Sequence, residues 1–478
     1  MGKLSKYIAP SLKEARKRIN KNTIHYHYVL NDEYKELGKG KYYHIKTYGC
    51  QGNLSDSEKI SGLLEAMGYK RIDNDENSDV IIFNTCAIRE NAENRVFGEL
   101  GRIKSLKKKN PNLIMAVCGC MPQEEGVVEE IKKKYHQVDI VFGTHNIHKL
   151  PEYIASIYKR PSRIIEVFSY EGDIYEDVPV IRDHNKKAWV NIMYGCDEFC
   201  TYCIVPYTRG KERSRLPEDI LKEVNELVSM GYIEVTLLGQ NVNSYGRDFT
   251  DRKYTFSDLL TDLSKTNIQR IRFTTSHPKD LDDETIEVMG KYPSIMPHLH
   301  LPVQSGSNKV LKKMNRKYTK EEYLEKIEKL KKAVPGISIT TDIIVAFPGE
   351  SEEDFNETLD LVKKAGFEGA YTFIYSPREG TPAASYPNDL TEDEKKQRLL
   401  TLNDLINEGF LMGNKRFEGE IVEVLVDGES DKDKDMLTGY TPHEKVVNFK
   451  GDKSLIGRIV KVKIEKAYSW HLRGKLCE

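Results

Sequence analysis

Alternating apolar and polar stretches divide the first half of the chain into strands and helices. Within residues 41–160, apolar runs of strand length predict strands at 42–48, 80–84, 113–117 and 138–142. Amphipathic stretches separate these runs, and the first of them opens at the Ser-Asp-Ser-Glu sequence of residues 55–58, a capping box typical of a helix start. Because nearly continuous apolar strands that alternate with helices are typical of a parallel sheet covered on both faces, the segment predicts a doubly wound α/β domain.

A longer version of the same alternation fills residues 182–412. Apolar runs predict strands at 188–194, 233–238, 270–275, 297–302, 337–345 and 370–375. Capping boxes at 319–322 and 391–394 predict the starts of two of the helices. Since a closed barrel of this type needs eight strand–helix units, the segment predicts a partial (β/α)6 barrel that is open at one side.

The two ends of the chain have different patterns. Residues 413–478 hold short β-like runs separated by Gly and Asp, which predict a small C-terminal β-barrel. Its last part, 445–475, carries nine Lys or Arg against two acidic residues, with aromatic side chains among them, and this mixture favours a nucleic-acid surface over a merely solvated one. Residues 1–40 are expected to be a basic N-terminal extension, because residues 1–22 hold seven Lys or Arg and one Glu.

Composition limits the chain to a few classes of protein. Its 478 residues are enough for about two to four domains, and 39% hydrophobic with 31% charged residues excludes a wholly disordered chain. The longest apolar runs, such as 343–347, have the length of a strand, and the first residues lack the pattern of a secretory signal. We therefore expect a soluble cytoplasmic protein without a membrane span. A net charge of −1 means that any affinity for nucleic acid comes from local patches.

The spacing of the cysteines indicates a metal centre. Cys196, Cys200 and Cys203 form a C-x3-C-x2-C loop directly after the first predicted strand of the barrel. A closed zinc site needs a fourth Cys or His, and none follows within about sixty residues, so zinc is the weaker alternative. A [4Fe–4S] cluster held by three thiolates keeps one iron open for an outside ligand, at the end of the barrel where such folds place their chemistry.

A second set of cysteines is dispersed along the N-terminal domain. Cys50, Cys86 and Cys120 each lie just past the carboxyl end of a predicted strand. Parallel strands present these ends at one edge of the sheet, where open α/β folds bind ligands, so the three thiols are expected to hold a second open cluster. Three unrelated buried thiols are the alternative. Cys118 still belongs to its strand and is expected in the core, and Cys477 near the terminus is expected to have no part in the site.

The cysteine loop at 196–203, with an aromatic residue before its last cysteine, resembles the cluster signature of radical S-adenosylmethionine (SAM) enzymes. The resemblance implies that SAM binds the open iron and is cleaved by one electron to methionine and a 5′-deoxyadenosyl radical. Polar residues at or near the ends of the barrel strands are then expected to contact SAM. The expected cofactor-binding residues are Tyr202, Gly239, Gln240, Asn241, Gln304 and Asp342.

Three further motifs resemble those of the methylthiotransferase family of radical SAM enzymes. They are TYGCQGNLSDSE at 47–58, NTCAIRENAENRVF at 84–97 and CGCMPQ at 118–123. The resemblance implies a methylthiotransferase N-terminal domain, a radical SAM core and an RNA-binding TRAM domain, at 41–160, 182–412 and 413–478. It also implies two [4Fe–4S] clusters, one that binds SAM and one auxiliary, which together with the SAM radical carry the chemistry without a side chain as catalytic acid or base.

The residues of these motifs are similar to those of the MiaB branch, which modifies tRNA. The matching stretches are TYGCQ at 47–51, NIMYGCD at 191–197, IVPYTRGKERSR at 204–215 and VVNF at 446–449. The resemblance implies methylthiolation at C2 of N6-isopentenyl(dimethylallyl)adenosine beside the anticodon of tRNA (position 37), with SAM as methyl donor and radical source. Gly52 and Tyr440 depart from the family pattern, in which a Met and an Arg are expected.

Other functions fit some of the same residues. A sister methylthiotransferase would act on threonylcarbamoyladenosine in tRNA or on an aspartate of a ribosomal protein. A two-cluster electron carrier and an RNA-binding protein with structural clusters are the non-enzymatic alternatives. The resemblance implies three partners, namely tRNA carrying isopentenyladenosine, a low-potential flavodoxin or ferredoxin, and a sulfur and cluster supply system; we expect a monomer. The basic run at 209–215 is expected either to contact RNA phosphate or the SAM carboxylate, or to form salt bridges.

Overall fold

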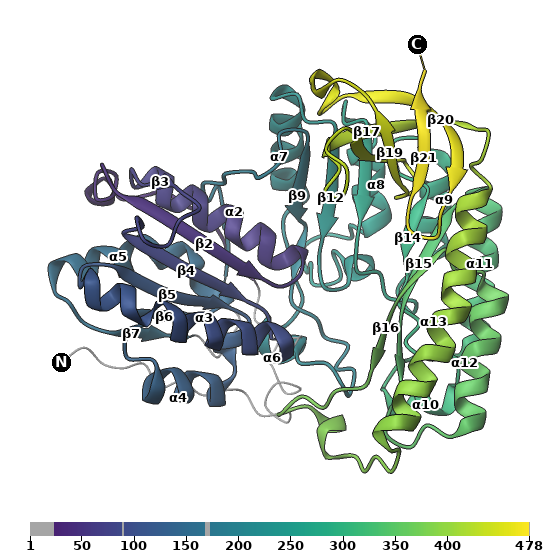
Figure 1. Cartoon of the computed structure of the whole chain (residues 1–478), viewed down its shortest axis with the longest axis horizontal. Coiled ribbons are helices and arrows are strands. Elements are labelled where there is room, and N and C mark those ends of the chain that lie inside the picture. The colour runs from purple at the N-terminus through teal and green to yellow at the C-terminus, as the bar shows by residue number, and fades with distance from the viewer. Residues whose placement is uncertain (1–22, 88–89, 168–172, 478) are drawn as a thin grey trace.

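The computed structural model describes residues 23–87, 90–167 and 173–477. Figure 1 shows a layered α/β domain, a larger half-open barrel, and a small β-barrel that lies against one end of the larger one. The basic run 1–22 of the expected extension lies outside the described residues. The residues after it form strand β1 (His25–His27), which pairs in parallel with β8 (Ile174–Glu176). No helix in the described part of the chain is both long enough and apolar enough to cross a membrane.

The N-terminal domain is a parallel sheet with helices on both faces, as the sequence predicted. Its described strands run in the order β3 (Lys70–Arg71), β2 (Tyr42–Tyr48), β4 (Val80–Thr85), β5 (Ile114–Gly119), β6 (Ile140–Phe142) and β7 (Ile164–Glu166). One face packs on α2 (Gln51–Ala66) and α5 (Leu150–Lys159), the other on α3 (Glu90–Lys109) and α4 (Glu125–Lys134). Successive residues of β4 enter opposite cores, which confirms the doubly wound class.

Helix α2 begins earlier than the capping box at 55–58 predicted. The helix runs over Gln51–Ala66, with Cys50 as its N-cap residue. The Asn53 side-chain oxygen accepts a hydrogen bond from the backbone N–H of Cys50 at 3.3 Å, and this local bond sets the start of the helix. The polar residues at 55–58 are instead buried within the helix; Ser57 contacts the N-terminal sheet, and Ser55 contacts the barrel.

The second body is the partial barrel that the sequence predicted. Its described strands are β9 (Lys187–Asn191), β12 (Glu234–Leu238), β13 (Arg270–Phe273), β14 (His298–His300), β15 (Ser338–Val345) and β16 (Gly369–Ile374). All pair in parallel within the sheets β9-β12-β13 and β14-β15-β16, and a bridge between Ile271 and Ile295 joins the two halves. No described pairing connects β9 to β16, so the barrel is open on that side.

Helices cover the outer wall of this barrel. They are α7 (Pro217–Ser229), α8 (Phe256–Leu263), α9 (Asp283–Lys291), α10 (Asn308–Lys313), α11 (Lys320–Ala333), α12 (Glu352–Ala365) and α13 (Glu392–Lys415). The capping boxes at Thr319 and Thr391 begin α11 and α13, as predicted. Outward residues of the strands and inward residues of the helices form one large apolar core between them.

The C-terminal body is a small closed barrel of antiparallel strands with one parallel pair. Its strands run β17 (Ile421–Glu429), β18 (Leu437–Tyr440), β19 (Val446–Lys450), β21 (Leu472–Leu476) and β20 (Ile459–Ala467) around the barrel. The sequence analysis missed β21, because that strand alternates Leu with Arg, Gly and Lys and has few apolar positions to mark it. Its parallel pairing with β19 closes the barrel.

A hairpin of the small barrel packs against one end of the large barrel. The turn between β18 and β19 offers backbone oxygens of Thr441 and Pro442 to the Arg272 guanidinium at 2.8 and 3.1 Å. The same guanidinium forms an ion pair with Glu444 at 2.7 Å. Lys445 extends the contact through an ion pair with Glu368 at 2.9 Å. These buried polar contacts fix the two barrels to one another.

Candidate functional site

Cys50, Cys86 and Cys120 leave the N-terminal sheet at one edge. The ladder pairs Thr85, the last residue of β4, with the last residues of β2 and β5, so the three cysteines follow at the same level. Gly119 turns the chain toward this edge with a φ of +99°, and a Cβ on it would lie 2.4 Å from the carbonyl oxygen of Thr85. Only glycine fits there. The register therefore brings together three cysteines that are far apart in sequence.

The three thiols interact electrostatically. Burial raises the pKa of the Cys120 thiol to about 12; the Arg209 guanidinium opposes this shift, and Cys86 and Cys50 add to it. All the cysteines are thiols in this structure. A buried thiol ionises readily only when a metal binds it, so this donor set fits an iron–sulfur cluster with three protein ligands. Cys118 lies in the core beneath the sheet, as predicted.

The loop Cys196–Cys203 follows β9 and the short strand β10 (Met193–Tyr194). Gly195 opens it with a φ of +74°, where a Cβ would lie 1.9 Å from the carbonyl oxygen of Lys211. The backbone N–H of Cys196 then donates to the carbonyl oxygen of Gly210, and that of Cys203 to Cys200, both at 3.0 Å. The loop is thus folded back on itself.

Residues after α10 hold the cysteine loop from behind. Thr201 donates its backbone N–H to the carbonyl oxygen of Met314 at 3.0 Å, and the Asn315 side chain donates to two carbonyl oxygens of the loop. Buried Arg316 donates to the sulfur of Cys200 at 3.4 Å. Hydrogen bonds to the sulfur ligands are a usual means of adjusting an iron–sulfur cluster, so the loop fits such a cluster. The sequence analysis missed Arg316, since no local motif connects it with cysteines more than a hundred residues earlier.

Burial also raises the pKa of two thiols of the cysteine loop 196–203. The pKa of Cys203 rises to about 12, with Cys200 adding to the effect of burial, and the pKa of Cys196 rises well above its usual value. Arg316 counteracts the shift of Cys203. As in the first set, a bound metal would supply the positive charge that thiolates need.

Helix α2 joins the two cysteine sets. Its Ser55 hydroxyl accepts from the Asn191 side chain at the end of β9 at 2.6 Å, and its Lys59 donates to the Tyr194 hydroxyl at 2.8 Å. Asp56, also on α2, pairs with Arg209 at 2.9 Å. Two of the residues that the sequence suggested as a cap, Ser55 and Asp56, therefore contact the first strand of the barrel and the segment after the cysteine loop.

A small apolar cluster brings the two sets into direct proximity. Ile204, the residue after the last cysteine of the barrel loop, packs with Ala87 and Cys120 of the N-terminal sheet, and Tyr207 packs on them. Ile204 directly precedes α6 (Val205–Thr208), the single helical turn that follows the loop, and Tyr207 lies within that turn. The two sets of thiols therefore face one shared region between the domains.

The basic run at 209–215 forms mostly ion pairs. Arg209 is buried against Asp56, and Arg215 is buried between Glu176 and Glu223, each at 2.6 Å. In strand β11 (Arg213–Ser214), the Arg213 guanidinium lies over the Tyr194 ring at 5.8 Å. Of the alternatives for this run, Arg209 and Arg215 form salt bridges, because their guanidinium groups are buried and paired.

The residues expected to contact SAM lie around the carboxyl ends of the barrel strands. Asn241 is 1% exposed and donates to Asp280 at 2.6 Å, while its side-chain oxygen has no hydrogen-bond partner among the described residues. A Cβ on Gly239 would lie 2.7 Å from Cγ of Met193, so this glycine also serves close packing inside the protein. Gln240 between them is half-buried.

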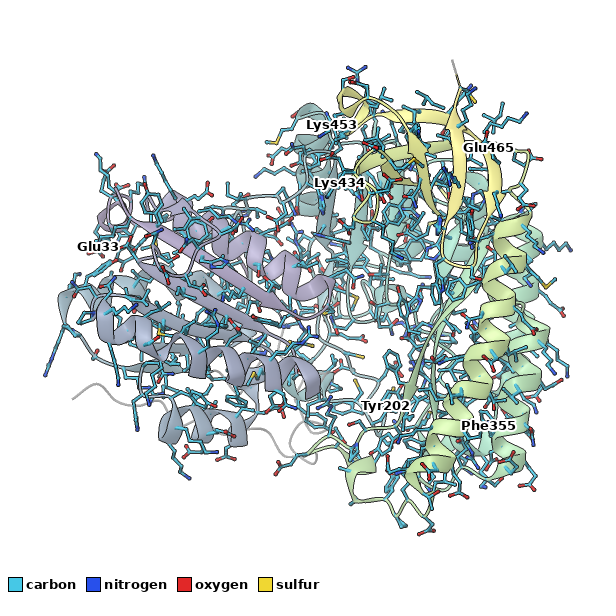
Figure 2. The ribbon with its side chains drawn as sticks, viewed as in Figure 1. Glu33, Tyr202, Phe355, Lys434, Lys453 and Glu465 are labelled. Carbon is cyan, nitrogen blue, oxygen red and sulfur yellow. The ribbon has the colours of Figure 1, made fainter. Side chains whose placement is uncertain are left out.

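The other expected contacts come from the second half of the barrel. Gln304 is buried with a φ of +70°, and its backbone N–H donates to the carbonyl oxygen of Asp342 at 2.8 Å. The Asp342 carboxylate has a partner, His300, at 3.4 Å. Tyr202 packs on a small core that includes Phe347, and Figure 2 shows it at the boundary between the N-terminal domain and the barrel.

Glu124 gives the N-terminal edge a pH dependence. Burial raises the pKa of its carboxyl group to about 7, with Glu93 adding to the shift, and its Oε1 has no hydrogen-bond partner among the described residues. Folding raises the pKa of this carboxyl group, so the protonated form favours the folded state. The contribution of Glu124 to stability is therefore complete below about pH 4.5 and is lost as the pH rises through about 7. We expect Glu124→Gln to stabilise the protein by about 3 kcal/mol at pH 8.5 and by about 2 kcal/mol at pH 6.

Thermal unfolding at the two pH values measures this difference. The exposed neighbour Glu125 provides the matched control, since Glu125→Gln should change stability little at either pH. Equal effects of Glu124→Gln at pH 6 and pH 8.5 would contradict the prediction.

Comparison with known families is consistent with this geometry. The radical SAM superfamily matches residues 190–362, the uncharacterized protein family UPF0004 matches residues 42–143, and the TRAM domain matches residues 415–477. A tRNA-2-methylthio-N(6)-dimethylallyladenosine synthase of Anoxybacillus flavithermus is 55% identical over 474 residues, which are 99% of this chain and 90% of that protein. The enzyme of the same name in Bacillus subtilis is 56% identical over 472 residues, 98% of this chain and 92% of that protein. The chain belongs to the tRNA-2-methylthio-N(6)-dimethylallyladenosine synthase family.

Solved structures share the fold over about three quarters of this chain. The radical SAM methyltransferase TsrM from Kitasatospora setae matches with a TM-score of 0.54 at 12% identity, over 72% of this chain and 74% of that one. The cobalamin-dependent radical SAM enzyme OxsB matches with a TM-score of 0.50 at 14% identity, over 77% of this chain and 56% of that one. At these identities the likeness concerns the fold alone. For the synthase family, the radical SAM and UPF0004 domains together imply SAM and [4Fe–4S] clusters as cofactors.

The two departures from the synthase family pattern occupy different sites. A Cβ on Gly52 would lie 3.3 Å from Nη2 of Arg209 and 3.5 Å from the sulfur of Cys50, so this position borders the N-terminal thiols. Tyr440 lies where the small barrel meets the large one, with Lys187 Nζ 5.0 Å from the centre of its ring. Its ring is therefore part of the contact between the two barrels.

Proposed function

We propose that the chain methylthiolates C2 of N6-dimethylallyladenosine beside the anticodon of tRNA, with SAM as methyl donor and radical source. Relatives at 55–56% identity over nearly the whole chain carry this activity in their names. The packing of Ile204 on Cys120 is the observation that carries the proposal. Insertion of sulfur at a C–H bond needs a radical source and a sulfur-bearing site that reach the same substrate atom, and this contact supports such an arrangement.

The proposal assigns one [4Fe–4S] cluster to Cys196, Cys200 and Cys203, and an auxiliary one to Cys50, Cys86 and Cys120. A cluster held by three thiolates supplies an open iron, at which SAM can bind and be reductively cleaved. The chain itself holds the thiolates in place. Arg316 donates a hydrogen bond to Cys200, and Arg209 places positive charge beside Cys120 and Cys50.

We assign SAM contacts to the residues that line the carboxyl ends of the barrel strands. The unpartnered Asn241 oxygen is available to accept from the SAM amino group, and Gln240 lies next to it. Gln304 and Asp342 approach from the other half of the barrel, and Tyr202 belongs to the cysteine loop and packs on the small core beside it. Gly239 keeps the backbone of this turn close to Met193. In this proposal no side chain is a catalytic acid or base.

Two further partners follow from the proposed reaction. Reductive cleavage of SAM needs a low-potential electron donor of the flavodoxin or ferredoxin type. Repeated turnover needs a system that restores sulfur and cluster, and the chain is proposed to act as a monomer in the cytoplasm. Anaerobic assays with a chemical reductant, and with and without added sulfide, test the first two requirements.

Nucleoside analysis tests the proposed function directly. Reconstituted protein, SAM, a reductant and tRNA bearing dimethylallyladenosine should yield the 2-methylthio nucleoside. Formation of 5′-deoxyadenosine without that nucleoside would contradict the proposal. Parallel reactions with tRNA bearing threonylcarbamoyladenosine distinguish the sister activity.

The outer face of the small barrel is suited to the tRNA backbone. Lys463 lies directly opposite Lys475 across the β20–β21 ladder, and Lys466 lies opposite Arg473, all four exposed. Like charges in opposite positions destabilise a sheet unless an anion neutralises them. Phosphate groups of the tRNA would supply that neutralisation.

Replacing Lys463 and Lys475 with Gln should therefore weaken tRNA binding and reduce its dependence on salt. We expect the slope of log K against log salt concentration to fall by about 2 units, one for each lost phosphate contact. Kd measurements between 50 and 200 mM salt give the slope. Lys332→Gln and Lys363→Gln on the outer helices serve as the control pair, since both lysines are exposed on the large barrel. An unchanged slope in the first pair would contradict the assignment.

A further inference from the structure

The inner wall of the second half of the barrel is lined by a distinct set of side chains. Alternate residues of β15 enter the apolar core beneath α11 and α12, among them Ile343, which leaves Asp342 and Ile344 on the opposite, inner face. The ladder pairs Asp342 with Tyr371 and Ile344 with Phe373 on β16. Because paired residues share a face, both aromatic rings also face the interior of the barrel.

These two rings are unusually exposed for aromatic side chains. Tyr371 is 64% exposed and Phe373 is 44% exposed, although both belong to a strand of the barrel. In a closed barrel of this type, inward side chains fill the interior and cover one another. The opening between β16 and β9 leaves this wall uncovered in the described part of the chain. A solvent-exposed pair of aromatic rings at such an opening is typical of a binding surface.

Polar groups border the aromatic pair on one side. His300 makes an edge-on contact with the Tyr371 ring, at 5.9 Å between ring centres, and pairs with Asp342 at 3.4 Å. Thr340 contacts His300 through its hydroxyl at 3.0 Å. The wall therefore has an apolar half and a hydrogen-bonding half, which suits a ligand with an apolar branch on a polar ring.

The wall is continuous with the cysteine loop. Ile344, the cross-strand partner of Phe373, packs on the same small core as Tyr202, and Tyr202 directly precedes Cys203. Figure 1 shows β16 on the side of the barrel that faces the N-terminal domain, where the second set of cysteines lies. A ligand on this wall would therefore be within the region that both sets of thiols face.

We propose that Tyr371 and Phe373 form the apolar subsite that receives the dimethylallyl group of the substrate adenosine, and that they determine the preference of the enzyme for tRNA carrying that group. The inference rests on the proposed function, which supplies a five-carbon apolar branch on an adenine ring. The branch lies against the two rings, and the polar half of the wall, with His300 and Thr340, is left for the nitrogen-rich edge of the base. An unmodified adenosine would leave the aromatic pair exposed to water and would bind more weakly.

Binding measurements with two tRNAs test this assignment. The tRNAs are identical in sequence, and one carries the dimethylallyl group on the adenosine beside the anticodon. Wild-type protein should bind the modified tRNA at least about tenfold more tightly, which is the discrimination that an apolar pocket gives. Tyr371→Ala combined with Phe373→Ala should reduce the preference to within about twofold, with little change in the Kd for unmodified tRNA.

Two further variants separate a specific subsite from a general loss of folding. Tyr371→Phe retains the ring and should keep the wild-type preference. Leu400→Ala with Met412→Ala removes two side chains of α13 that are 57% and 74% exposed, and it should also leave the preference unchanged. Iron content and melting temperature of the Tyr371→Ala and Phe373→Ala single variants verify that the barrel is intact.

The outcomes are distinct. A preference that survives the double substitution, an equal loss of affinity for both tRNAs, or a wild-type protein without any preference would each overturn the subsite. A wild-type protein that prefers the modified tRNA but forms no 2-methylthio nucleoside would instead contradict the proposed function and leave the binding subsite supported.

Discussion

Alanine replacement of Cys50, Cys86 and Cys120 together is expected to halve the iron content of anaerobically reconstituted protein, from about eight irons per chain to about four. Transfer of the methylthio group to tRNA should disappear. Reductive cleavage of SAM to 5′-deoxyadenosine should persist, because the loop Cys196–Cys203 has its own hydrogen bonds and depends on the barrel for its shape. Iron and sulfide analysis, together with nucleoside and 5′-deoxyadenosine assays, measure the three effects.

Cys118→Ala is the matched control for that experiment. Cys118 comes from the same strand as Gly119 but lies in the apolar core, so its loss should reduce stability without removing iron. Replacement of Cys196, Cys200 and Cys203 should also leave about four irons, but should abolish SAM cleavage. If the Cys50, Cys86 and Cys120 variant retained about eight irons, the assignment of an auxiliary cluster to these thiols would be wrong.

Arg209→Met is expected to destabilise the contact between the N-terminal domain and the barrel by about 3–5 kcal/mol. The Asp56 and Arg209 side chains are only 6% and 8% exposed, so removal of the guanidinium leaves a buried carboxylate without its cation. Urea unfolding of the reconstituted protein, with a separate probe in each domain, measures the loss and shows whether the domains still unfold together.

A second arginine and a double variant provide the comparison. Arg252 pairs with Glu218 at the surface, where the side chains are 35% and 64% exposed, so Arg252→Met should cost about 1 kcal/mol or less. Asp56→Asn in the Arg209→Met background should recover part of the loss, because it removes the uncompensated charge. If Arg209→Met cost no more than Arg252→Met, the buried pair would have no special part in joining the domains.

The meeting of Cys50, Cys86 and Cys120 at one edge could be predicted from sequence because it depends on a simple geometric rule. Each cysteine follows an apolar run, and parallel strands align their carboxyl ends. The same regularity made the partial barrel predictable, since each strand–helix unit carries its own apolar pattern. The assignment of clusters to the two cysteine sets remains a prediction that the iron analysis tests.

Features that depend on contacts between distant segments were not predictable in this way. The polar residues 55–58 have the composition of a helix cap, and contacts with the N-terminal sheet and the barrel explain their burial within α2. Arg316 reaches Cys200 because α10 and the cysteine loop are neighbours in space. Arg209 and Arg215 belong to a basic run in the sequence, but both are buried and form ion pairs with acidic residues elsewhere in the chain.

The contact between the two barrels holds the small barrel at a fixed distance from the opening of the large one. Arg272 binds the hairpin at Thr441, Pro442 and Glu444 through buried contacts, so the basic face of the small barrel cannot swing relative to the opening beside β16. An RNA anchored at one end of a rigid span presents only nucleotides at a matching distance to the other end. We therefore expect this contact to make the protein select a target base by its position in the folded RNA as well as by its chemistry.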